Sequence, residues 1–501
     1  MKCAEPIIEM QYRVANYGIR LLISEKEHYC LTKHGKEIVL GIGLESIEHD
    51  IRDSILGEVI APLILLKPLY INGEEGLVHE LFCSYYTRLV REEYKYLEKM
   101  FQKNTKHLYI SKIYPIVARI SRLQIMYTWL KLLFSEQLRD PNYYKWLSGL
   151  ANLCLNKLGI YSPAPLIELD KVIDMVKAGE TDEKAIKQRL VVMTRVAADL
   201  VSPSLLQAIP TQLIMDSISH KPHPLLRDPL LLVRLDSARV ATKLVGFYDQ
   251  LYALTGLHKL LAASKPVTRR AGMVRSVVTV EVGGIRPAVV KRYRDITAFK
   301  WLVAAILSLP LPKPLLGTLA RLNNEYYYNR LLSEHGYKVP SPILIDPRRR
   351  MAAYAYIDGR DLSTFLQQGE MIEKLYYSVG QLLASLHRDG VSLWDANPSN
   401  FIYAGDELYL VDLEQAREAR TLAEKAFDIA VALFYSFLYN TKDPSARARA
   451  LAEGYLDAGG GLEILTEAAK YKYMAPFLTS IPVNVLEKAR KSLLRVALDN
   501  S

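Results

Sequence analysis

The stretch that decides the fold reads Asp395-Ala-Asn-Pro-Ser-Asn400-Phe-Ile-Tyr-Ala-Gly-Asp-Glu-Leu-Tyr-Leu-Val-Asp412. Two short apolar runs flank a turn around Gly405, and this pattern predicts a β-hairpin. Asn400 stands at the start of the first strand and Asp412 follows the second. Because antiparallel strands pair in register, these two side chains are expected at the same end of the hairpin.

Asp395 lies five residues before Asn400, on the loop that enters the hairpin. Two carboxylates and one amide at a strand end can hold Mg²⁺, which prefers oxygen ligands and usually keeps substrate phosphates as its other partners. The alternative is that Asn400 and Asp412 only cap the ends of a surface hairpin. The hairpin by itself does not decide between a phosphoryl-transfer site and such a turn, so the flanking segments must.

Composition is that of a globular protein. The chain has 501 residues, of which 50% are hydrophobic and 24% charged, and 64 Lys and Arg against 54 Asp and Glu leave a net charge of +10. Its length suffices for two or three domains. This modest positive charge permits an acidic partner, but the short basic clusters do not predict direct nucleic-acid binding.

Cysteine spacing and hydropathy bear on the compartment. Cys3, Cys30, Cys83 and Cys154 show no zinc-type spacing, which favours four reduced thiols and a cytoplasmic location. The N-terminus lacks a signal pattern. The most apolar stretch, 301–309, is too short to span a bilayer, so no membrane insertion is expected.

The secondary-structure pattern of the N-terminal half changes once, from strand signals to helical spacing. Residues 1–85 carry β signals, with hairpins expected around His34-Gly35 and around Asn72-Gly73, the second pairing 69–71 with 77–81. Residues 86–262 show helical spacing, including a helix expected from Thr181 to Leu200. No catalytic constellation is visible here, so the function of these two segments cannot be predicted.

Residues 263–501 follow a different pattern. A linker-like stretch over 264–272 precedes β runs at 276–282 and 287–291, which predict a hairpin around Gly283-Gly284. A helix is expected over 321–335, then two strands, then mostly helix. We therefore predict an α+β fold: a mostly helical N-terminal domain with a few short strands, then a bilobal domain with a small β-rich lobe (263–357) and a larger helical lobe (358–501).

Lys291 and Glu325 form a second constellation. Phosphoryl transfer needs a cation on the phosphates, because their charge must be neutralised while the terminal group leaves. Lys291 ends a predicted strand that can carry it into the cleft between the lobes, and Glu325 on the following helix is the best-placed acid to orient it. The alternative is a solvated lysine and glutamate; the order of the elements favours the functional interpretation.

This order resembles the protein-kinase-like superfamily, and most of all its atypical branch, the RIO kinases and the kinase/ATPase subunit of the KEOPS tRNA-modification complex. The resemblance covers roughly 272–440. It rests on motifs that occur in the family's order: Val289-Val-Lys291, Glu325 before Glu-His-Gly336, Tyr354-Ala-Tyr-Ile-Asp-Gly359, Leu386-His387, Asp395 with Asn400, Asp412, and Glu424-Lys-Ala-Phe-Asp428.

The resemblance implies a role for each matched residue. ATP would lie between the lobes, with adenine on the hinge backbone of Ala355, Tyr356 and Ile357. Lys291 would contact the phosphates and take part in catalysis, oriented by Glu325.

The same resemblance assigns the residues of the hairpin region. Asn400 and Asp412 would hold Mg²⁺, and Asp395 would deprotonate the attacking hydroxyl or water. His387 and Asp428 would support the catalytic loop. The activity implied is an ATP- and Mg²⁺-dependent phosphotransferase of the atypical serine/threonine protein kinase type, or mainly an ATPase.

Several departures keep alternatives open. No glycine-rich loop precedes Lys291; only Gly272 is available, with Arg269, Arg270 or Arg275 to compensate. Leu-Trp-Asp395 and Asp412-Leu-Glu differ from the usual triplets, and 412–428 is too short for a regulated activation loop. The alternatives are a small-molecule phosphotransferase (sugar, choline or aminoglycoside) and a pseudokinase scaffold. The acceptor, protein or small molecule, cannot be predicted, and nucleic acid is expected only as an indirect partner.

Overall fold

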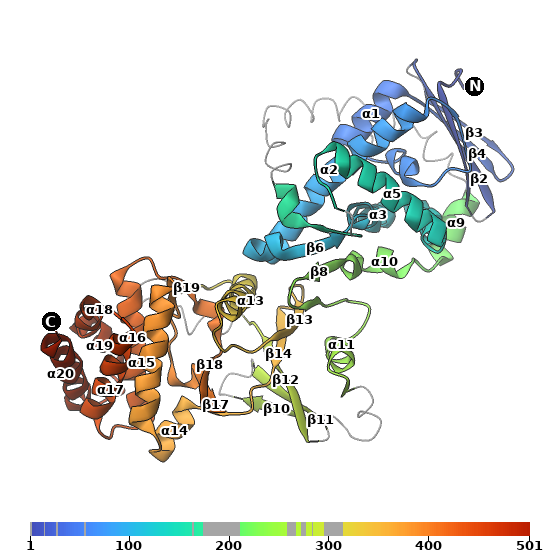
Figure 1. The fold of residues 1–501 in the computed structure, drawn as a ribbon. Coiled ribbons are helices and arrows are strands. Elements are labelled where there is room, and N and C mark those ends of the chain that lie inside the picture. The colour runs from blue at the N-terminus through green and yellow to red at the C-terminus, as the bar shows by residue number, and fades with distance from the viewer. Residues whose placement is uncertain are drawn as a thin grey trace. The chain divides into compact units, whose positions relative to one another are not determined.

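The computed structural model describes residues 3–14, 16–26, 29–54, 57–162, 165–173, 211–257, 267–271, 277–282, 284–294 and 314–500. The chain divides into two compact units. One comprises Met1–Lys99, Thr105–Asp236 and Val240–Phe247, and the other Met100–Asn104, Ser237–Arg239 and Tyr248–Ser501. Both contain helices and strands (Figure 1), which confirms the mixed α+β class.

The first unit contains a five-stranded sheet of order β3-β4-β2-β1-β5. Alternate side chains of β1 are buried, as expected of a strand with one face on a core. β2 and β4 pair in parallel, whereas the neighbouring pairs are antiparallel. The strands are β1 (Ile8–Val14), β2 (Tyr17–Ser24), β3 (Tyr29–His34), β4 (Glu37–Gly43) and β5 (Tyr70–Gly73).

One of the two hairpins predicted in this unit is confirmed. β3 and β4 pair around the His34-Gly35 turn. The other prediction is wrong, because 77–81 lies in helix α2 (Glu75–Phe101) and β5 pairs with β1 instead. Leu81, Phe82, Tyr85 and Leu89 of α2 are buried, so the apolar residues of this stretch belong to a helical face that continues well beyond it.

Helices make up most of the rest of the first unit. A small sheet of order β7-β6-β8 also lies there. The predicted helix over 181–200 lies outside the described residues. The remaining elements are α1 (Leu44–Asp53), α3 (Tyr114–Met126), α4 (Thr128–Leu138), α5 (Pro141–Lys157), α9 (Thr211–Ser219), α10 (Pro224–Arg227), β6 (Leu108–Ser111), β7 (Leu166–Glu168) and β8 (Val233–Leu235).

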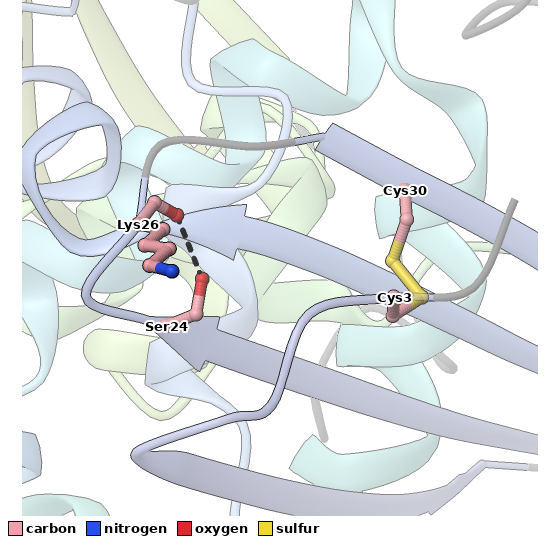
Figure 2. Close-up of a disulfide and its surroundings, with 4 residues drawn as sticks. All are labelled: Cys3, Ser24, Lys26 and Cys30. Atoms are coloured by element: carbon pink, nitrogen blue, oxygen red, sulfur yellow. Dashed lines mark hydrogen bonds between the residues drawn. A yellow bond between two sulfur atoms is a disulfide. The ribbon is translucent and has the colours of Figure 1, made fainter.

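The four cysteines form two disulfides, so the prediction of reduced thiols is wrong. Cys3 is bonded to Cys30 of β3 (Figure 2), and Cys83 of α2 is bonded to Cys154 of α5. The partners are 27 and 71 residues apart in sequence, and the fold brings their Cα atoms to 5.4 and 5.1 Å. Linear spacing cannot reveal such pairs. The cytoplasmic location inferred from reduced thiols stays a prediction.

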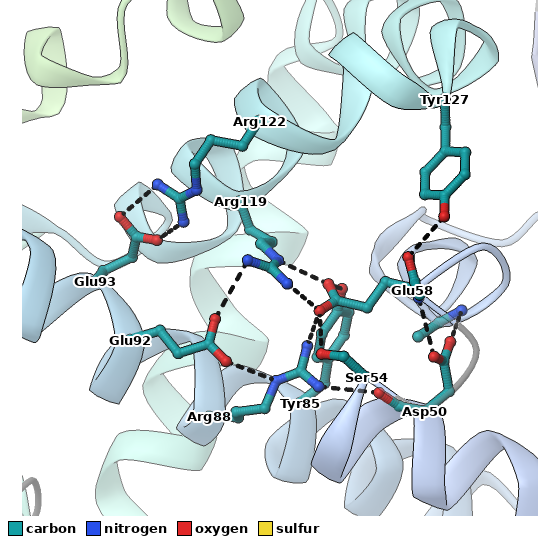
Figure 3. Close-up of polar contacts among 12 residues, drawn as sticks. Asp50, Ser54, Glu58, Tyr85, Arg88, Glu92, Glu93, Arg119, Arg122 and Tyr127 are labelled. Carbon is teal, nitrogen blue, oxygen red and sulfur yellow. Dashed lines mark hydrogen bonds and ion pairs between the residues drawn. The ribbon is translucent and has the colours of Figure 1, made fainter. Parts of the chain in front are cut away.

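A buried carboxylate joins several elements of the first unit. Glu58 is fully buried and accepts hydrogen bonds from Tyr85 (2.6 Å) and Ser54 (2.6 Å). The guanidinium groups of Arg88 and Arg119 also bond its carboxylate (Figure 3). Burial opposes the charge of Glu58, but these arginines outweigh it and lower its pKa to about 2. The cluster has a structural explanation, because every carboxylate oxygen has donors.

The second unit contains a sheet of order β10-β11-β12-β14-β13-β9. The predicted hairpin around Gly284 is confirmed as β11 and β12. The linker expected over 264–272 is partly wrong, because β10 forms within it and pairs with β11. The strands are β9 (Arg239–Val240), β10 (Val267–Ala271), β11 (Val277–Val282), β12 (Ile285–Arg292), β13 (Pro342–Asp346) and β14 (Met351–Ala355).

Helices and short strands make up the rest of the second unit. The predicted helix over 321–335 is α13 (Thr318–Glu334), and the predicted hairpin around Gly405 is β17 (Phe401–Ala404) with β18 (Glu407–Leu410), paired Phe401 to Leu410. The other elements are α11 (Phe247–Leu254), β15 (Arg360–Asp361), α14 (Leu362–Gln368), α15 (Ile372–Arg388), β16 (Val391–Ser392), β19 (Arg417–Glu418), α16 (Leu422–Tyr435), α17 (Pro444–Asp457), α18 (Leu462–Ala468), α19 (Tyr471–Met474) and α20 (Val483–Asp499).

Two glycines allow helices α15 and α17 of this unit to pack closely. A Cβ on Gly380 of α15 would lie 2.1 Å from the carbonyl oxygen of Leu451 on α17. A Cβ on Gly454 of α17 would lie 2.0 Å from that of Tyr377 on α15. Only glycine permits this approach, which places α15 and α17 side by side (Figure 1) over a core shared with α16 and α20.

A search for membrane spans among the described helices gave no candidate, since each is too short or too polar to cross a bilayer. The apolar stretch 301–309 lies outside the described residues.

Candidate active site

Lys291 and Glu325 meet as predicted from their elements. Lys291 lies on β12, between β11 and β14, where it pairs with Val277 and Ala352. Its Nζ donates to Oε1 of Glu325 on α13 at 2.7 Å and to Oδ1 of Asp412 at 2.9 Å. The side chains of Lys291 and Glu325 are 13% and 4% exposed, so this pair is shielded from water. One ammonium therefore lies between two carboxylates that are distant in sequence.

A tyrosine that the sequence analysis missed completes the surroundings of Glu325. The hydroxyl of Tyr293 donates to Oε2 of Glu325 at 2.7 Å, so each carboxylate oxygen has its own donor. Tyr293 follows Lys291 by two positions and lies directly after the end of β12, where continued strand alternation would point both side chains to the same face. This spacing could have pointed to Tyr293 as a neighbour of Lys291. Burial raises the pKa of Glu325 to about 7, although Lys291 opposes this shift.

The hairpin brings Asn400 and Asp412 to one end. The backbone N–H of Val411 donates to the carbonyl of Asn400 at 2.9 Å, and the Asn400 side chain donates to the carbonyl of Asp395 at 3.0 Å. Asp412 has a φ of 62°, in the left-handed region that non-glycine residues seldom occupy. Such a conformation at an aspartate that contacts Lys291 is typical of a functional position.

Asp428 of α16 supports the loop before Asp395. Its two oxygens accept the backbone N–H groups of Leu393 (2.8 Å) and Trp394 (2.6 Å). His387 lies 3.1 Å from the same carboxylate, and its other ring nitrogen lies 2.8 Å from the hydroxyl of Tyr455. Asp428 is fully buried and His387 is 3% exposed. These contacts hold the backbone of the loop before Asp395, which is the supporting role predicted for Asp428 and His387.

A cavity of about 650 Å³ adjoins these groups. Its volume lies within the range of small-molecule sites, about 300–1,000 Å³. Asp395 is not among its lining residues. Its lining includes seven residues predicted to bind nucleotide or metal: Lys291, Glu325, Ala355, Tyr356, Ile357, Asn400 and Asp412.

The donor set suits a hard cation. Asp412 offers carboxylate oxygens and Asn400 an amide oxygen, which are the ligand types that Mg²⁺ takes. Within the described chain, one group of three acidic side chains could hold a metal: Glu325, Asp412 and Glu414, with ligand atoms within 4.8 Å of one another. Glu414 was not among the predicted site residues, although it stands only two residues after Asp412.

Glu414 is held by a buried arginine. Nη1 of Arg321 on α13 donates to Oε1 of Glu414 at 3.0 Å, and Nη2 donates to the carbonyl of Arg294 at 2.7 Å. Arg321 is 1% exposed. Burial and the nearby Asp412 raise the pKa of Glu414 against the attraction of Lys291 and Arg321. This arrangement ties the segment after Asp412 to α13.

The residues predicted to act in place of a glycine-rich loop are only partly among the described residues. Gly272 and Arg275 lie outside the described residues, whereas Arg269 and Arg270 lie on β10. The role of Arg269 or Arg270 in place of a glycine-rich loop stays a prediction.

Comparisons with known proteins give partial matches. No protein-family model matches the chain. A probable bifunctional tRNA threonylcarbamoyladenosine biosynthesis protein of Methanosarcina barkeri is 34% identical over 129 residues, 25% of this chain and 22% of that protein. A probable serine/threonine-protein kinase BUD32 homolog of Archaeoglobus fulgidus is 28% identical over 131 residues, 26% of this chain and 64% of that protein.

Two further matches are to a sugar kinase and a kinase structure. A 3-deoxy-D-manno-octulosonic acid kinase of Vibrio vulnificus is 28% identical over 99 residues, 18% of this chain and 42% of that protein. The Rio2 kinase of Chaetomium thermophilum, in an ADP/Mg²⁺-phosphoaspartate complex, aligns with 51% of this chain and 78% of its own at 14% identity and a TM-score of 0.25.

The chain thus spans about a fifth of the length of the bifunctional relatives and under two thirds of the BUD32 homolog. Within these bounds the predicted resemblance of part of this chain to the atypical protein-kinase-like superfamily, including its archaeal KEOPS-type kinases, is confirmed.

Proposed function

We propose that this protein is an ATP- and Mg²⁺-dependent phosphotransferase of the atypical serine/threonine protein kinase type, with ATP hydrolysis as its activity when no acceptor is bound. The observation that carries the proposal is the placement of Lys291 between Glu325 and Asp412 beside a cavity of nucleotide size. A structural ion pair would not require the neighbouring hairpin, loop and cavity to converge on it.

We assign each residue around the cavity a separate role in binding ATP or Mg²⁺. Lys291 would bind the phosphates, and Glu325 would hold its ammonium in place. The backbone of Ala355, Tyr356 and Ile357 would bind adenine. Asn400 and Asp412 would hold Mg²⁺, which when bound neutralises phosphate charge.

Asp395 would act as the base. It stands on the loop whose backbone Asp428 holds, and its own carbonyl is bonded by Asn400. Its carboxylate would accept the proton of the attacking hydroxyl or water, a contribution of about 10²–10⁴-fold. A fixed loop matters here because proton transfer needs hydrogen-bonding distance to the attacking group.

A second candidate function is transfer of phosphate to a small alcohol. The 3-deoxy-D-manno-octulosonic acid kinase among the relatives favours it. So does the short segment between Asp412 and Asp428, which offers little surface on which a peptide could dock.

The test measures ADP release by the purified full chain with ATP and Mg²⁺. Asp395→Asn should abolish turnover and leave nucleotide binding, measured by calorimetry, largely intact. Asp412→Ala should weaken Mg²⁺-dependent ATP binding. Asp443→Asn is the matched control, because Asp443 is exposed and far along the chain from the motif residues. Equal turnover by wild type and Asp395→Asn would instead point to a pseudokinase.

The acceptor is a separate question. Transfer of ³²P from labelled ATP should be measured to proteins, to components of tRNA-modifying complexes and to small alcohols including sugars. Label in a protein fraction supports the first candidate, and label in a sugar supports the second.

A further inference from the structure

A short segment from the N-terminal part of the chain contacts the helix that carries Glu325. Residues Met100–Asn104 belong to the second compact unit, although more than 200 residues separate them from α13 in sequence. They include the end of α2 and the start of a 3-10 helix, Gln102–His107. Their hydrogen-bond partners on α13 are Asn323 and Asn324, the two residues immediately before Glu325.

Asn104 and Asn323 form the buried part of this contact. Nδ2 of Asn104 donates to the carbonyl oxygen of Asn323 at 2.8 Å and to its Oδ1 at 3.0 Å. Nδ2 of Asn323 donates in return to the carbonyl of Met100 at 3.1 Å. Both asparagines are 1% exposed. Buried amides bonded in both directions fix one register between the segment and the helix, because any shift would leave polar groups unpaired.

Lys103 makes the second part of the contact. Its Nζ donates to Oδ1 of Asn324 at 2.7 Å and lies over the rings of Tyr327 (4.0 Å) and Tyr328 (4.3 Å). Lys103 as a residue is exposed, yet its ammonium is desolvated enough to lower its pKa to about 8. The ammonium group is thus held by the amide and the two rings, although the residue as a whole is exposed.

Asn324 links Lys103 to the backbone that follows Asp412. Its Nδ2 donates to the carbonyl oxygens of Glu414 (3.0 Å) and Ala416 (2.7 Å), while its Oδ1 accepts from Lys103. One side chain thus joins the N-terminal segment, the helix of Glu325 and the backbone that follows Asp412. Loss of the Lys103 contact would release one side of this junction.

We propose that Lys103 and Asn104 are positioning residues for the active site, and that Met100–Asn104 holds α13 in the place that the Lys291–Glu325 pair needs. The proposal rests on the proposed function and extends it to a part of the chain that no sequence motif connects with catalysis. A kinase-like domain that begins near residue 263 would lack this support. Displacement of a catalytic group by about 1 Å can cost about 10²-fold in rate, so support at the residues next to Glu325 matters.

The experiment uses the full chain with Lys103→Met, Lys103→Arg and Asn104→Leu. Methionine keeps the stem of Lys103 and removes its charge and donor, whereas arginine keeps both. Lys106→Met is the matched control, because Lys106 is an exposed lysine of the same 3-10 helix. Each variant is examined by hydrogen–deuterium exchange of residues 318–334 without nucleotide, by kcat and KM for ATP, and by thermal unfolding.

We expect Lys103→Met and Asn104→Leu to speed hydrogen–deuterium exchange in α13. Both should also lower kcat about tenfold, because each removes a buried hydrogen bond. The change in KM for ATP should be smaller. Lys103→Arg should restore kcat, and Lys106→Met should match wild type. Exchange and kcat equal to those of Lys106→Met would overturn the proposal. So would a loss of kcat that follows Tm alone and is not rescued by arginine.

The two proposals fail in different ways. If wild type shows no turnover, the proposed function fails, and the exchange of α13 still decides whether the segment holds the helix. If wild type turns ATP over and the variants do so equally well with unchanged exchange, only the positioning role fails.

Discussion

Lys291 and Glu325 form a shielded ion pair, with Nζ 2.7 Å from Oε1, in which the lysine comes from a central strand of the sheet and the glutamate from α13. Glu325 is almost fully enclosed, so its charge depends on donors rather than on water. Lys291 satisfies one oxygen and Tyr293 the other. The pair is therefore held from both sides, and its energetics can be probed at each donor.

Tyr293→Phe removes the second donor of Glu325 and keeps the aromatic ring. We expect turnover of ATP to fall about tenfold or more, because a hydrogen bond to a buried charged group contributes about 1.5–3 kcal/mol. Steady-state kinetics checks this. Tyr337→Phe is the control, since it removes a tyrosine–carboxylate bond to Asp389 at an exposed position. Equal effects of the two substitutions would contradict the importance of Tyr293.

Asp428→Asn should weaken the loop before Asp395. The amide presents an NH₂ group to one of the two backbone N–H donors, of Leu393 or Trp394, that now face carboxylate oxygens. We expect a loss of about 2 kcal/mol in the free energy of unfolding, because a buried donor is left unpaired, and lower turnover. Denaturant unfolding and kinetics measure the two effects. Wild-type values for both would remove Asp428 from its supporting role.

Glu58→Gln should destabilise the first unit without touching the cavity residues. The substitution leaves the guanidinium groups of Arg88 and Arg119 without a buried counter-charge. Breaking a buried pair in this way costs about 3–5 kcal/mol. Denaturant unfolding monitored by circular dichroism measures the change. Glu136→Gln, in an exposed pair with Arg139, should have little effect.

Glu58 also predicts how stability depends on pH. Its pKa in the folded protein is about 2, below its ordinary value of 4.5, because the neighbouring arginines outweigh the effect of burial. A lowered carboxylate pKa adds stability that is fully present above the ordinary value and is lost as pH falls through the folded value. The difference in unfolding free energy between wild type and Glu58→Gln should therefore shrink between pH 4.5 and about 2. A constant difference over that range would contradict the assignment.

The two disulfides predict specific peptide pairs. Mass spectrometry of a non-reducing digest should find Cys3 linked to Cys30 and Cys83 linked to Cys154. Cys83→Ala with Cys154→Ala should lower the free energy of unfolding by about 2–4 kcal/mol, because that bond closes a long loop of the unfolded chain. Free thiols at all four positions in protein purified without reductant would contradict both bonds.

The sequence by itself determined the elements whose signals are local. Short apolar runs on either side of turn glycines were enough for the β11–β12 and β17–β18 hairpins, and the helix predicted over 321–335, closed by Gly336, is α13. The register of an antiparallel pair then predicted that Asn400 and Asp412 would meet at one end of the hairpin. The order of the elements predicted the pair of Lys291 with Glu325.

Only the tertiary structure decided the contacts between residues that no local pattern relates. The pairing of four cysteines, the bond from Tyr293 to Glu325, the Arg321–Glu414 pair and the docking of Met100–Asn104 on α13 all depend on how finished elements pack. The strand predicted over 77–81 was wrong for a related reason, because a short apolar run fits one face of a strand or of a helix equally well. Burial against the rest of the core selects between them.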